Sequence, residues 1–193
     1  MNLKTFTTSL LVAGLAFGSS ALMAADYVID TKGAHAFIQF RVQHLGYSWL
    51  YGRFNEFSGR FSYDEAAQEK ASIEVTIKTA SVDSNHAERD KHLRSKDFLD
   101  VDKYPEAKFV STGYAPGKDG KGVLKGRLTL HGVTKAVEIQ VEPIGAGKDP
   151  WGGYRRGFEG KTKFAMADFG ILKNLGPKSK DVEMILSIEG IRQ

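Results

Sequence analysis

Cysteine is absent from this chain of 193 residues. Disulfides, thiolate nucleophiles, thiolate metal ligands and a lipid anchor on cysteine are therefore all excluded. Without cross-links, stability has to come from burial of apolar side chains, and a single domain of this length can bury enough of them. A basic stripe is also missing, because the 27 lysines and arginines are interleaved with 23 acids. We therefore expect no nucleic-acid partner.

Apolar runs long enough to cross a bilayer are missing as well. The longest apolar run, Leu10–Phe17, follows a single lysine and precedes small residues that end at Ala24. This order is typical of a secretory signal peptide. We expect residues 1–24 to be a signal peptide that is cleaved before Ala25. Residues 25–193 would then form one domain in the bacterial periplasm.

Apolar and polar residues alternate along most of the remaining chain, which is the pattern of strands with one buried face. In the first such segment, Ile38, Phe40 and Val42 share one face, while Gln39 and Arg41 share the other. The segments expected to form strands are 27–30, 36–44, 59–63, 73–78, 107–113, 124–131, 137–142, 158–164 and 182–188.

About eight strands of this kind predict an all-β fold, with an antiparallel sheet that is solvated on one face only. Such a sheet buries its apolar face by closing into a barrel or by stacking as a sandwich. We favour an eight-stranded antiparallel barrel, because a barrel of this size leaves room for one small ligand. A barrel with a filled core and a sandwich are the alternatives.

One polar segment, NHAERDKHLRSKDFLD (residues 85–100), interrupts the strands and is expected to contain a helix over about residues 86–95. Asn85 fits the N-cap position, and Glu88 follows three residues later, as in a capping box. With about 100° of rotation per residue, His86 and His92 lie roughly 120° apart around the helix axis. They cannot share a metal ion, and we expect no metal site.

Ion pairs at helical spacing explain the two histidines better than metal binding does. His86 is expected to pair with Asp90, and His92 with Glu88, because each acid is four residues away. Arg89 and Leu93 fall on one stripe of the helix. The helix is therefore expected to lie across a barrel end, as a lid on a cavity or as a cover on a filled core.

Catalytic motifs such as the GxSxG elbow are also absent, so no enzyme is expected. One alternative is an enzyme that acts on a lipid or quinone, with His44, His86 or His92 as acid or base. Another is an accessory protein that docks on an inner-membrane electron-transfer partner. Trp151, Tyr154 and Phe158, which flank two arginines, motivate that second alternative.

Aromatic residues gather in HLGYSWLYGRFNEF, residues 44–57, which holds five of them in fourteen positions against 11% in the whole chain. This density suits a packed core, the lining of an apolar pocket, or a patch that meets a membrane. Some of the five have to be core, but a linking segment this aromatic is hard to bury fully unless it borders a cavity.

Several segments resemble the YceI-like family of bacterial periplasmic proteins, and the resemblance is close to its enterobacterial members. The most specific one contains an arginine-aspartate-x-histidine-leucine run followed by an aspartate-phenylalanine step and a tyrosine-proline. The segments that carry the resemblance are HAFIQFRVQHLGYSWLYGRF, NHAERDKHLRSKDFLDVDKYPEAKF, LTLHGVTKAV, DPWGGYRRGFEGKTKF and DVEMILSIEG.

The resemblance implies a lipocalin-like barrel with a long apolar cavity, and it implies no catalytic residue, metal or cofactor. Arg89, Asp90 and His92 are implied as polar groups at the mouth or in structural pairs. The ligand-binding residues implied by position are Phe40, Val42, His44, Trp49, Ile77, Phe109, Leu128, Phe158 and Phe164.

The expected function is binding of a polyisoprenoid chain, such as an isoprenoid quinone, its precursor or a similar long amphipathic lipid. Each buried methylene contributes about 0.8 kcal/mol, so a chain of tens of carbons binds tightly without a charged contact. We expect a role in lipid transport, storage or scavenging, with a link to stress response and transient contact with the inner membrane. The oligomeric state is left open, a dimer being one alternative.

Overall fold

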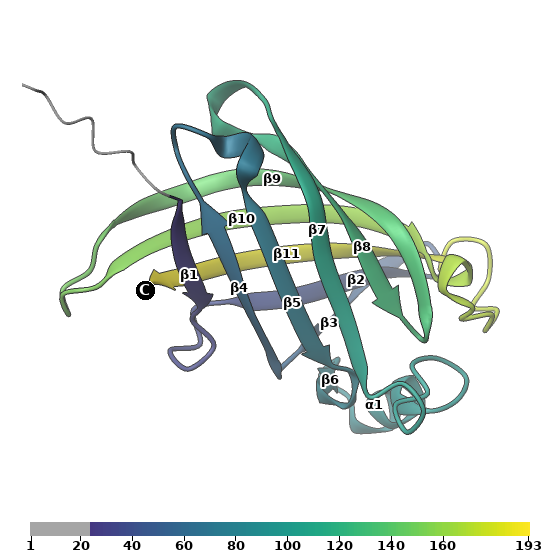
Figure 1. Ribbon diagram of the computed structural model, residues 1–193. Helices are drawn as coiled ribbons and strands as arrows, with labels where there is room; N and C mark the ends of the chain where they lie inside the picture. The colour runs from purple at the N-terminus through teal and green to yellow at the C-terminus, as the bar shows by residue number, and fades with distance from the viewer. Residues whose placement is uncertain (1–23) are drawn as a thin grey trace, which may run out of the picture.

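One antiparallel sheet of eleven strands spans most of residues 24–193, the part of the chain that the computed structural model describes (Figure 1). Residues 1–23 of the expected signal peptide lie outside the described part of the chain. The strands are β1 (Ala25–Ile29), β2 (Phe37–His44), β3 (Ser48–Phe54), β4 (Phe57–Tyr63), β5 (Ser72–Lys78), β6 (Val82–Asp83), β7 (Glu106–Pro116), β8 (Gly122–Leu130), β9 (Val133–Lys148), β10 (Tyr154–Ala165) and β11 (Asp181–Arg192).

Between residues 24 and 193, helical structure is limited to short elements between the strands. Within the described residues, no helix has the length and apolar character that a membrane span requires. The elements are the α-helix α1 (Ala87–Arg94) and the 3-10 turns η1 (Gln68–Lys70), η2 (Thr79–Ser81), η3 (Lys118–Gly120) and η4 (Met166–Phe169).

Eight of the strands form a closed ring in the order β1, β4, β5, β7, β8, β9, β10 and β11. The ring closes where β1 pairs antiparallel with β11, so that Ile29 lies opposite Gly190 and Tyr27 lies opposite Arg192. The prediction of an eight-stranded antiparallel barrel with one helix is confirmed. The sandwich alternative is wrong, because the sheet closes on itself.

The sheet continues past the ring at one end. There β11 pairs with β2 over Glu183–Ser187, and β2 pairs with β3 along most of its length. The two residues of β6 are added to the end of β3, and the chain then enters α1. Figure 1 shows α1 beside β6. Asp97, just after α1, pairs with Lys173 of the connection from β10 to β11. The extra strands therefore place the helix at the end of the barrel that η4 also occupies.

β3 was missed by the sequence analysis, which treated residues 44–57 as a strand-linking segment. Its residues do alternate: Leu50 and Phe54 line the interior, while Trp49 and Tyr51 are exposed. The pattern is hidden because the inward position between Leu50 and Phe54 is a glycine, Gly52, which lacks an apolar side chain.

Aromatic rings on the barrel wall lie over glycines of nearby strands. A Cβ atom built on Gly52 would come within 2.3 Å of Phe40 Cζ, and one on Gly126 would come within 2.2 Å of Phe109 Cζ. Gly52 lies on β3, which pairs with β2, the strand that carries Phe40. Gly126 lies on β8, which pairs with β7, the strand that carries Phe109. Each ring thus fills the place of a missing side chain, as in other glycine–aromatic pairs of sheets. This packing holds the rings close to the wall.

The helix starts one residue later than predicted. His86 is the N-cap, and its Nδ1 accepts a hydrogen bond of 3.2 Å from the Arg89 backbone N–H. Asn85 precedes the cap with φ of 61°, a left-handed conformation that asparagine tolerates, and its N–H donates to Asp83 Oδ1. The predicted capping box of Asn85 with Glu88 is therefore wrong.

The predicted ion pairs within the helix are wrong as well, because both partners come from outside it. The buried Asp90 carboxylate accepts hydrogen bonds from the backbone N–H and the hydroxyl of Ser84, at 2.8 and 2.5 Å. His92 Nε2 lies 2.8 Å from Asp97 Oδ2. These contacts fasten both ends of α1 to neighbouring loops.

Replacing Gly126 with alanine should destabilise the barrel. The new Cβ would meet both the Phe109 ring and, at 2.8 Å, the Val110 carbonyl oxygen, so the backbone has to shift. Overpacking of this kind costs about 1–3 kcal/mol, which urea denaturation measures as a lower free energy of unfolding. Gly113→Ala in β7 is the matched control, because its Cβ would have no atom within 4 Å. Equal losses in both variants would contradict the packing argument.

Candidate ligand-binding cavity

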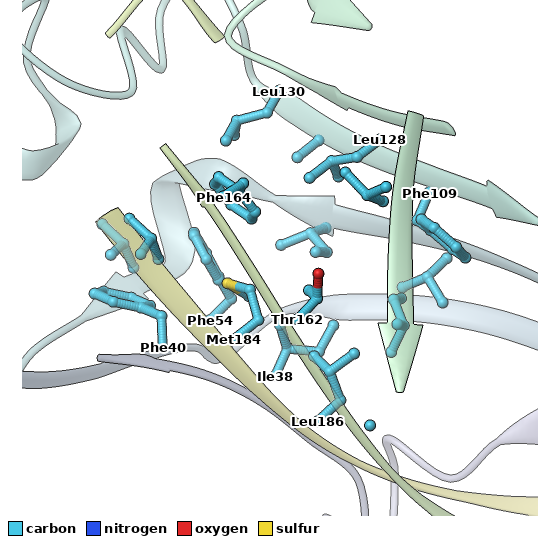
Figure 2. A pocket seen from close by; sticks show the side chains of 18 of the residues that line it. Ile38, Phe40, Phe54, Phe109, Leu128, Leu130, Thr162, Phe164, Met184 and Leu186 are labelled. Atoms are coloured by element: carbon cyan, nitrogen blue, oxygen red, sulfur yellow. The ribbon is translucent and has the colours of Figure 1, made fainter. Parts of the chain in front are cut away.

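A cavity of about 490 Å³ lies inside the barrel. This volume is within the range of about 300–1,000 Å³ that is typical of small-molecule pockets. Figure 2 shows side chains from several strands converging on it, and the labelled ones are aliphatic or aromatic except for Met184 and Thr162. The labelled residues are Ile38, Phe40, Phe54, Phe109, Leu128, Leu130, Thr162, Phe164, Met184 and Leu186.

Most of the residues expected to bind the ligand line this cavity, although their binding role stays a prediction. They come from β2, β5, β7, β8 and β10, whose inward faces alternate with solvated ones. The lining members of the predicted set are Phe40, Val42, His44, Ile77, Phe109, Leu128, Phe158 and Phe164.

Trp49 is placed elsewhere than expected. It lies on the outer face of β3, where the Arg41 guanidinium is 4.1 Å from the centroid of its ring. The reason is strand parity: Leu50 lines the cavity, so the side chain before it points outward. The other tryptophan, Trp151, is not part of the lining either.

Among the three predicted mouth residues, Arg89 and His92 line the cavity, whereas Asp90 is not part of the lining and is bound to Ser84. Leu93 of the same helix also lines it. The helix thus presents one mixed face to the interior, which supports its interpretation as a lid and not as a cover on a filled core.

Several lining residues were not singled out from the sequence. Met184 and Leu186 lie on the inward face of β11, within the expected strand 182–188, but they were not among the expected ligand-binding residues. Phe98 and Leu99, which follow the helix, also line the cavity. Ile171 and Leu175 lie between η4 and β11. They have no periodic pattern, so only the folded chain brings them to the cavity.

Two buried tyrosines lie toward one end of the cavity, and one of them packs against an arginine. Tyr63 and Tyr114 line this end, and burial raises the pKa of both hydroxyl groups. The Arg156 guanidinium lies 4.5 Å from the centroid of the Tyr63 ring and also bonds to Glu65 and Tyr27. Arg156 is 8% exposed, so it is a buried structural group and not a basic surface residue.

The other end is the mouth of the cavity, between α1, the turn from β2 to β3, and the connection from β10 to β11. His44 and Leu45 line it from the turn, and Leu175 lines it from the connection. Ser179 joins the two loops: its hydroxyl donates to the Gln43 carbonyl oxygen at 2.6 Å and accepts from the Leu45 N–H at 3.3 Å.

Arg89 is the arginine in the lining, and it has spare hydrogen-bonding capacity. Its Nε donates to Ser84 Oγ at 2.7 Å, and its Nη2 donates to the Ser84 carbonyl oxygen at 2.5 Å. Within residues 24–193, none of its nitrogens forms an ion pair with a carboxylate. A guanidinium has five N–H donors, so Arg89 can still donate to a polar group at the mouth.

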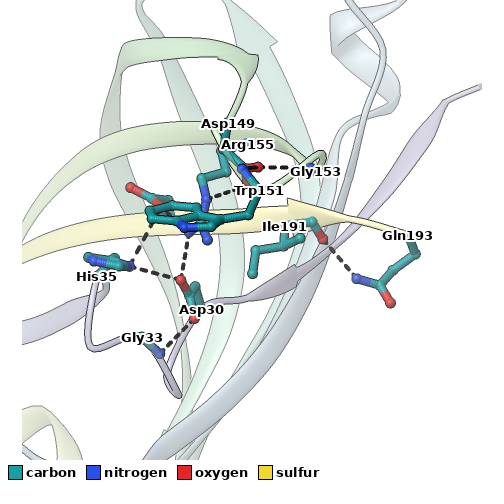
Figure 3. A network of polar contacts seen from close by, with 10 residues as sticks. Asp30, Gly33, His35, Asp149, Trp151, Gly153, Arg155, Ile191 and Gln193 are labelled. Carbon is teal, nitrogen blue, oxygen red and sulfur yellow. Dashed lines mark hydrogen bonds and ion pairs between the residues drawn. The ribbon is translucent and has the colours of Figure 1, made fainter.

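A charged cluster lies outside the cavity, around Arg155 (Figure 3). Arg155 Nη1 donates to Asp30 at 2.6 Å and to Glu189 at 2.5 Å, and its Nε donates to Asp149 at 2.8 Å. His35 Nδ1 lies 2.9 Å from Asp30. The oxygens of Asp30 and Glu189 and a nitrogen of His35 lie close enough for a metal ion, but Arg155 already supplies the positive charge. The cluster therefore ties the segment that follows β1 to β10 and β11.

The fold and the site together define a class of protein: a closed antiparallel barrel that encloses one apolar cavity, with a helix at its mouth. The family model described as a YceI-like domain matches residues 27–190. The chain therefore belongs to the YceI-like family, as its motifs suggested.

Relatives and solved structures agree with this assignment. A UPF0312 protein of Azotobacter vinelandii is 57% identical over 187 residues, covering 94% of this chain and 97% of the relative. The crystal structure of Burkholderia cenocepacia BcnA is similar with a TM-score of 0.75 at 22% identity, covering 83% of this chain and 98% of that one. A polyisoprenoid binding domain from Saccharophagus degradans has a TM-score of 0.62 at 17% identity, with 86% and 98% covered. At these identities the two structures show a shared fold.

Acid should weaken the Arg155 cluster in a defined range of pH. Hydrogen bonds from His35 and Arg155 lower the pKa of the Asp30 carboxyl from its usual 3.8 to about 2. A lowered pKa stabilises the fold above pH 3.8, and the contribution disappears as pH falls through 2. We expect Asp30→Asn to lose about 1–2 kcal/mol of unfolding free energy at pH 5 and much less near pH 2.

Urea denaturation at a series of pH values measures this difference. Asp102→Asn, at an exposed carboxylate outside the cluster, is the control and should be neutral throughout. A difference between wild type and Asp30→Asn that stayed constant from pH 5 to pH 2 would contradict the role of the Asp30 carboxylate.

Proposed function

We propose that this protein binds one polyisoprenoid chain inside its barrel. The observation that carries the proposal is the cavity, whose lining is apolar over nearly all of its surface and whose mouth carries an arginine and two histidines. Membership of the YceI-like family supports the same ligand class, as does the shared fold with a domain described as polyisoprenoid binding. The protein acts by binding, and no residue is proposed to be catalytic.

The chemical character of the lining favours a flexible, methyl-branched hydrocarbon over a rigid polar ligand. Aliphatic and aromatic groups such as Ile38, Phe109 and Leu186 provide contacts along its length without fixed donors or acceptors (Figure 2). Each methylene removed from water contributes about 0.8 kcal/mol, so burial of the chain accounts for most of the affinity. The side chains of the cavity wall can therefore distinguish ligands by the width of their hydrocarbon chain, but not by their functional groups.

The polar end of the ligand belongs at the mouth. Arg89, His92 and His44 are among the groups there that can donate to a carbonyl or phosphate oxygen. Arg89 fits this role best, because Ser84 holds its side chain and leaves N–H donors unused. An isoprenoid quinone or a prenyl phosphate would both place an oxygen acceptor at this point.

We also propose that the protein works in the periplasm, where it transports, stores or scavenges the lipid. The signal-peptide pattern of the first 24 residues supports this location. A carrier of this kind would shield a chain that is nearly insoluble in water.

Extraction is the direct test of the ligand. Protein purified after expression of the full chain is extracted with organic solvent, and mass spectrometry should find a polyisoprenoid lipid. Absence of lipid, together with no uptake of added isoprenoid quinone in native mass spectrometry, would refute the proposal. Tryptophan fluorescence is a poor substitute, since neither Trp49 nor Trp151 lines the cavity.

Filling the cavity should abolish binding without unfolding the barrel. Leu128→Trp introduces an indole into the lining, and we expect at least about a tenfold lower occupancy by native mass spectrometry. Val110→Trp is the matched control. Val110 of β7 lies opposite Arg127 of β8 and is exposed on the outer face. If the two variants retain lipid equally, the ligand does not occupy this cavity.

Changing Arg89 should alter headgroup preference more than overall affinity. We expect Arg89→Gln to weaken binding of a prenyl phosphate by about tenfold, because a hydrogen bond between two charged groups is lost. Binding of the uncharged prenol of equal length should change much less. Competition binding with the two lipids measures the ratio, and an unchanged ratio would remove Arg89 from the headgroup site.

An enzyme that uses a histidine acid or base is the competing function, and the same samples test it. His44 and His92 line the mouth, but His86 uses its Nδ1 to cap the helix. Isoprenoid quinone recovered unaltered after long incubation argues for a binding protein. A product that disappears with His44→Ala or His92→Ala would argue for an enzyme.

A further inference from the structure

Apolar side chains are exposed on both loops that border the mouth. In the turn from β2 to β3, Leu45 is 56% exposed and Tyr47 is 87% exposed. In the connection from η4 to β11, Leu172 is 77% exposed and Leu175 is 36% exposed. We call these four residues the mouth rim. The hydrogen bond from Leu45 N–H to Ser179 Oγ holds the two loops together, so the rim is one surface.

The rim is continuous with the interior. Leu45 and Leu175 line the cavity and are also exposed to solvent, so apolar surface runs without a break from the inside of the barrel to its outside. Isolated exposed leucines are common on proteins, but a group of them around a ligand entrance indicates an interaction surface.

The backbone at Leu45 adds an independent observation. Leu45 has φ of 54° and Gly46 has φ of 88°, and the Tyr47 N–H donates to the His44 carbonyl oxygen at 2.9 Å. Positive φ at both Leu45 and Gly46, together with this hydrogen bond, is the pattern of a type I′ turn, whose first central position favours asparagine, aspartate or glycine. A leucine there is strained, and strain of this kind is retained where a side chain has a task. Its consequence is that an aliphatic side chain stands at the tip of the hairpin.

The charge next to the rim is positive. Lys173, Lys178 and Lys180 are all exposed in the connection that carries Leu172 and Leu175. Lys173 pairs with Asp97 at 2.5 Å, whereas no carboxylate of residues 24–193 pairs with Lys178 or Lys180. Aliphatic groups flanked by lysines suit the headgroup region of an anionic bilayer, which attracts basic side chains and accepts apolar ones.

We infer that the mouth rim docks on the surface of an anionic phospholipid bilayer and places the cavity entrance against it. This inference rests in part on the proposed ligand, because a long hydrocarbon chain would otherwise cross water between bilayer and cavity. It also moves the membrane contact away from the connection between β9 and β10, which carries Trp151 and which we call the Trp151 hairpin. There Arg155 is paired and Arg156 is buried. That hairpin lies at the far end of β9 and β10 from η4 (Figure 1).

Sedimentation with vesicles tests the inference. Lipid-free protein is mixed with vesicles of equal parts phosphatidylglycerol and phosphatidylethanolamine, and separately with vesicles of phosphatidylcholine alone. The wild type should bind the anionic vesicles more strongly, and high salt should weaken that binding. Leu45→Asn combined with Leu172→Ser should lower the partition coefficient by about tenfold or more, because two aliphatic side chains no longer insert.

The variants separate docking from folding. Leu45→Asn suits the type I′ turn and should leave the melting temperature equal or higher, so lost binding would not reflect a damaged barrel. Ile144→Ser is the matched control, because Ile144 is 65% exposed on β9 toward the Trp151 hairpin and should bind vesicles like the wild type.

Three results would overturn the inference: no binding by the wild type, an equal loss in Ile144→Ser, or a wild-type dimer that the rim variants convert to monomer by analytical ultracentrifugation. The last would make the rim a contact between two copies of the chain. These outcomes are distinct from failure of the proposed ligand. Lipid recovered by extraction without vesicle binding would reject docking alone, and vesicle binding without extracted lipid would reject the ligand alone.

Discussion

The interior of the barrel stays open because aromatic rings on its wall lie over glycines. Phe40 stands over Gly52 and Phe109 over Gly126, so each large ring takes the place of a side chain that the paired strand lacks. Side chains at those glycines would push the rings toward the barrel axis and fill the space that a ligand needs. The cavity, its apolar lining and its capacity for a hydrocarbon chain all depend on this arrangement.

The two ends of the cavity differ in chemistry. Toward one end, Tyr63 is packed beneath the buried Arg156. The mouth instead consists of short segments fastened by single side chains, Ser84 to α1, Asp97 to His92 and Lys173, and Ser179 to the turn. Polar groups that hold the mouth in place also leave donors for a headgroup, so structural support and ligand orientation come from the same few residues.

Alternation predicted the strands and the inward faces well, because a period of two is enforced wherever one face of a sheet is buried. It could not separate an open cavity from a filled core, since both need the same apolar residues. Trp49 was misplaced because Gly52 hides the parity of β3. The helix was found within a residue, but the true partners of Asp90 and His92 are fixed by tertiary contacts. Ile171 and Leu175 have no local pattern, and only folding places them at the mouth.

The closure of the ring between β1 and β11 has a consequence for how the chain reaches its fold. Ile29 and Gly190 pair although they come from opposite ends of the sequence, so the ring cannot close before the last strand is available. Contacts of such long range make folding slow, because the entropy of a large loop is lost before the pairing is gained. Until then β1 presents an unpaired edge where β11 will later pair with it. In a newly made chain, β1 therefore has to avoid pairing with strands of other molecules until β11 has been synthesised.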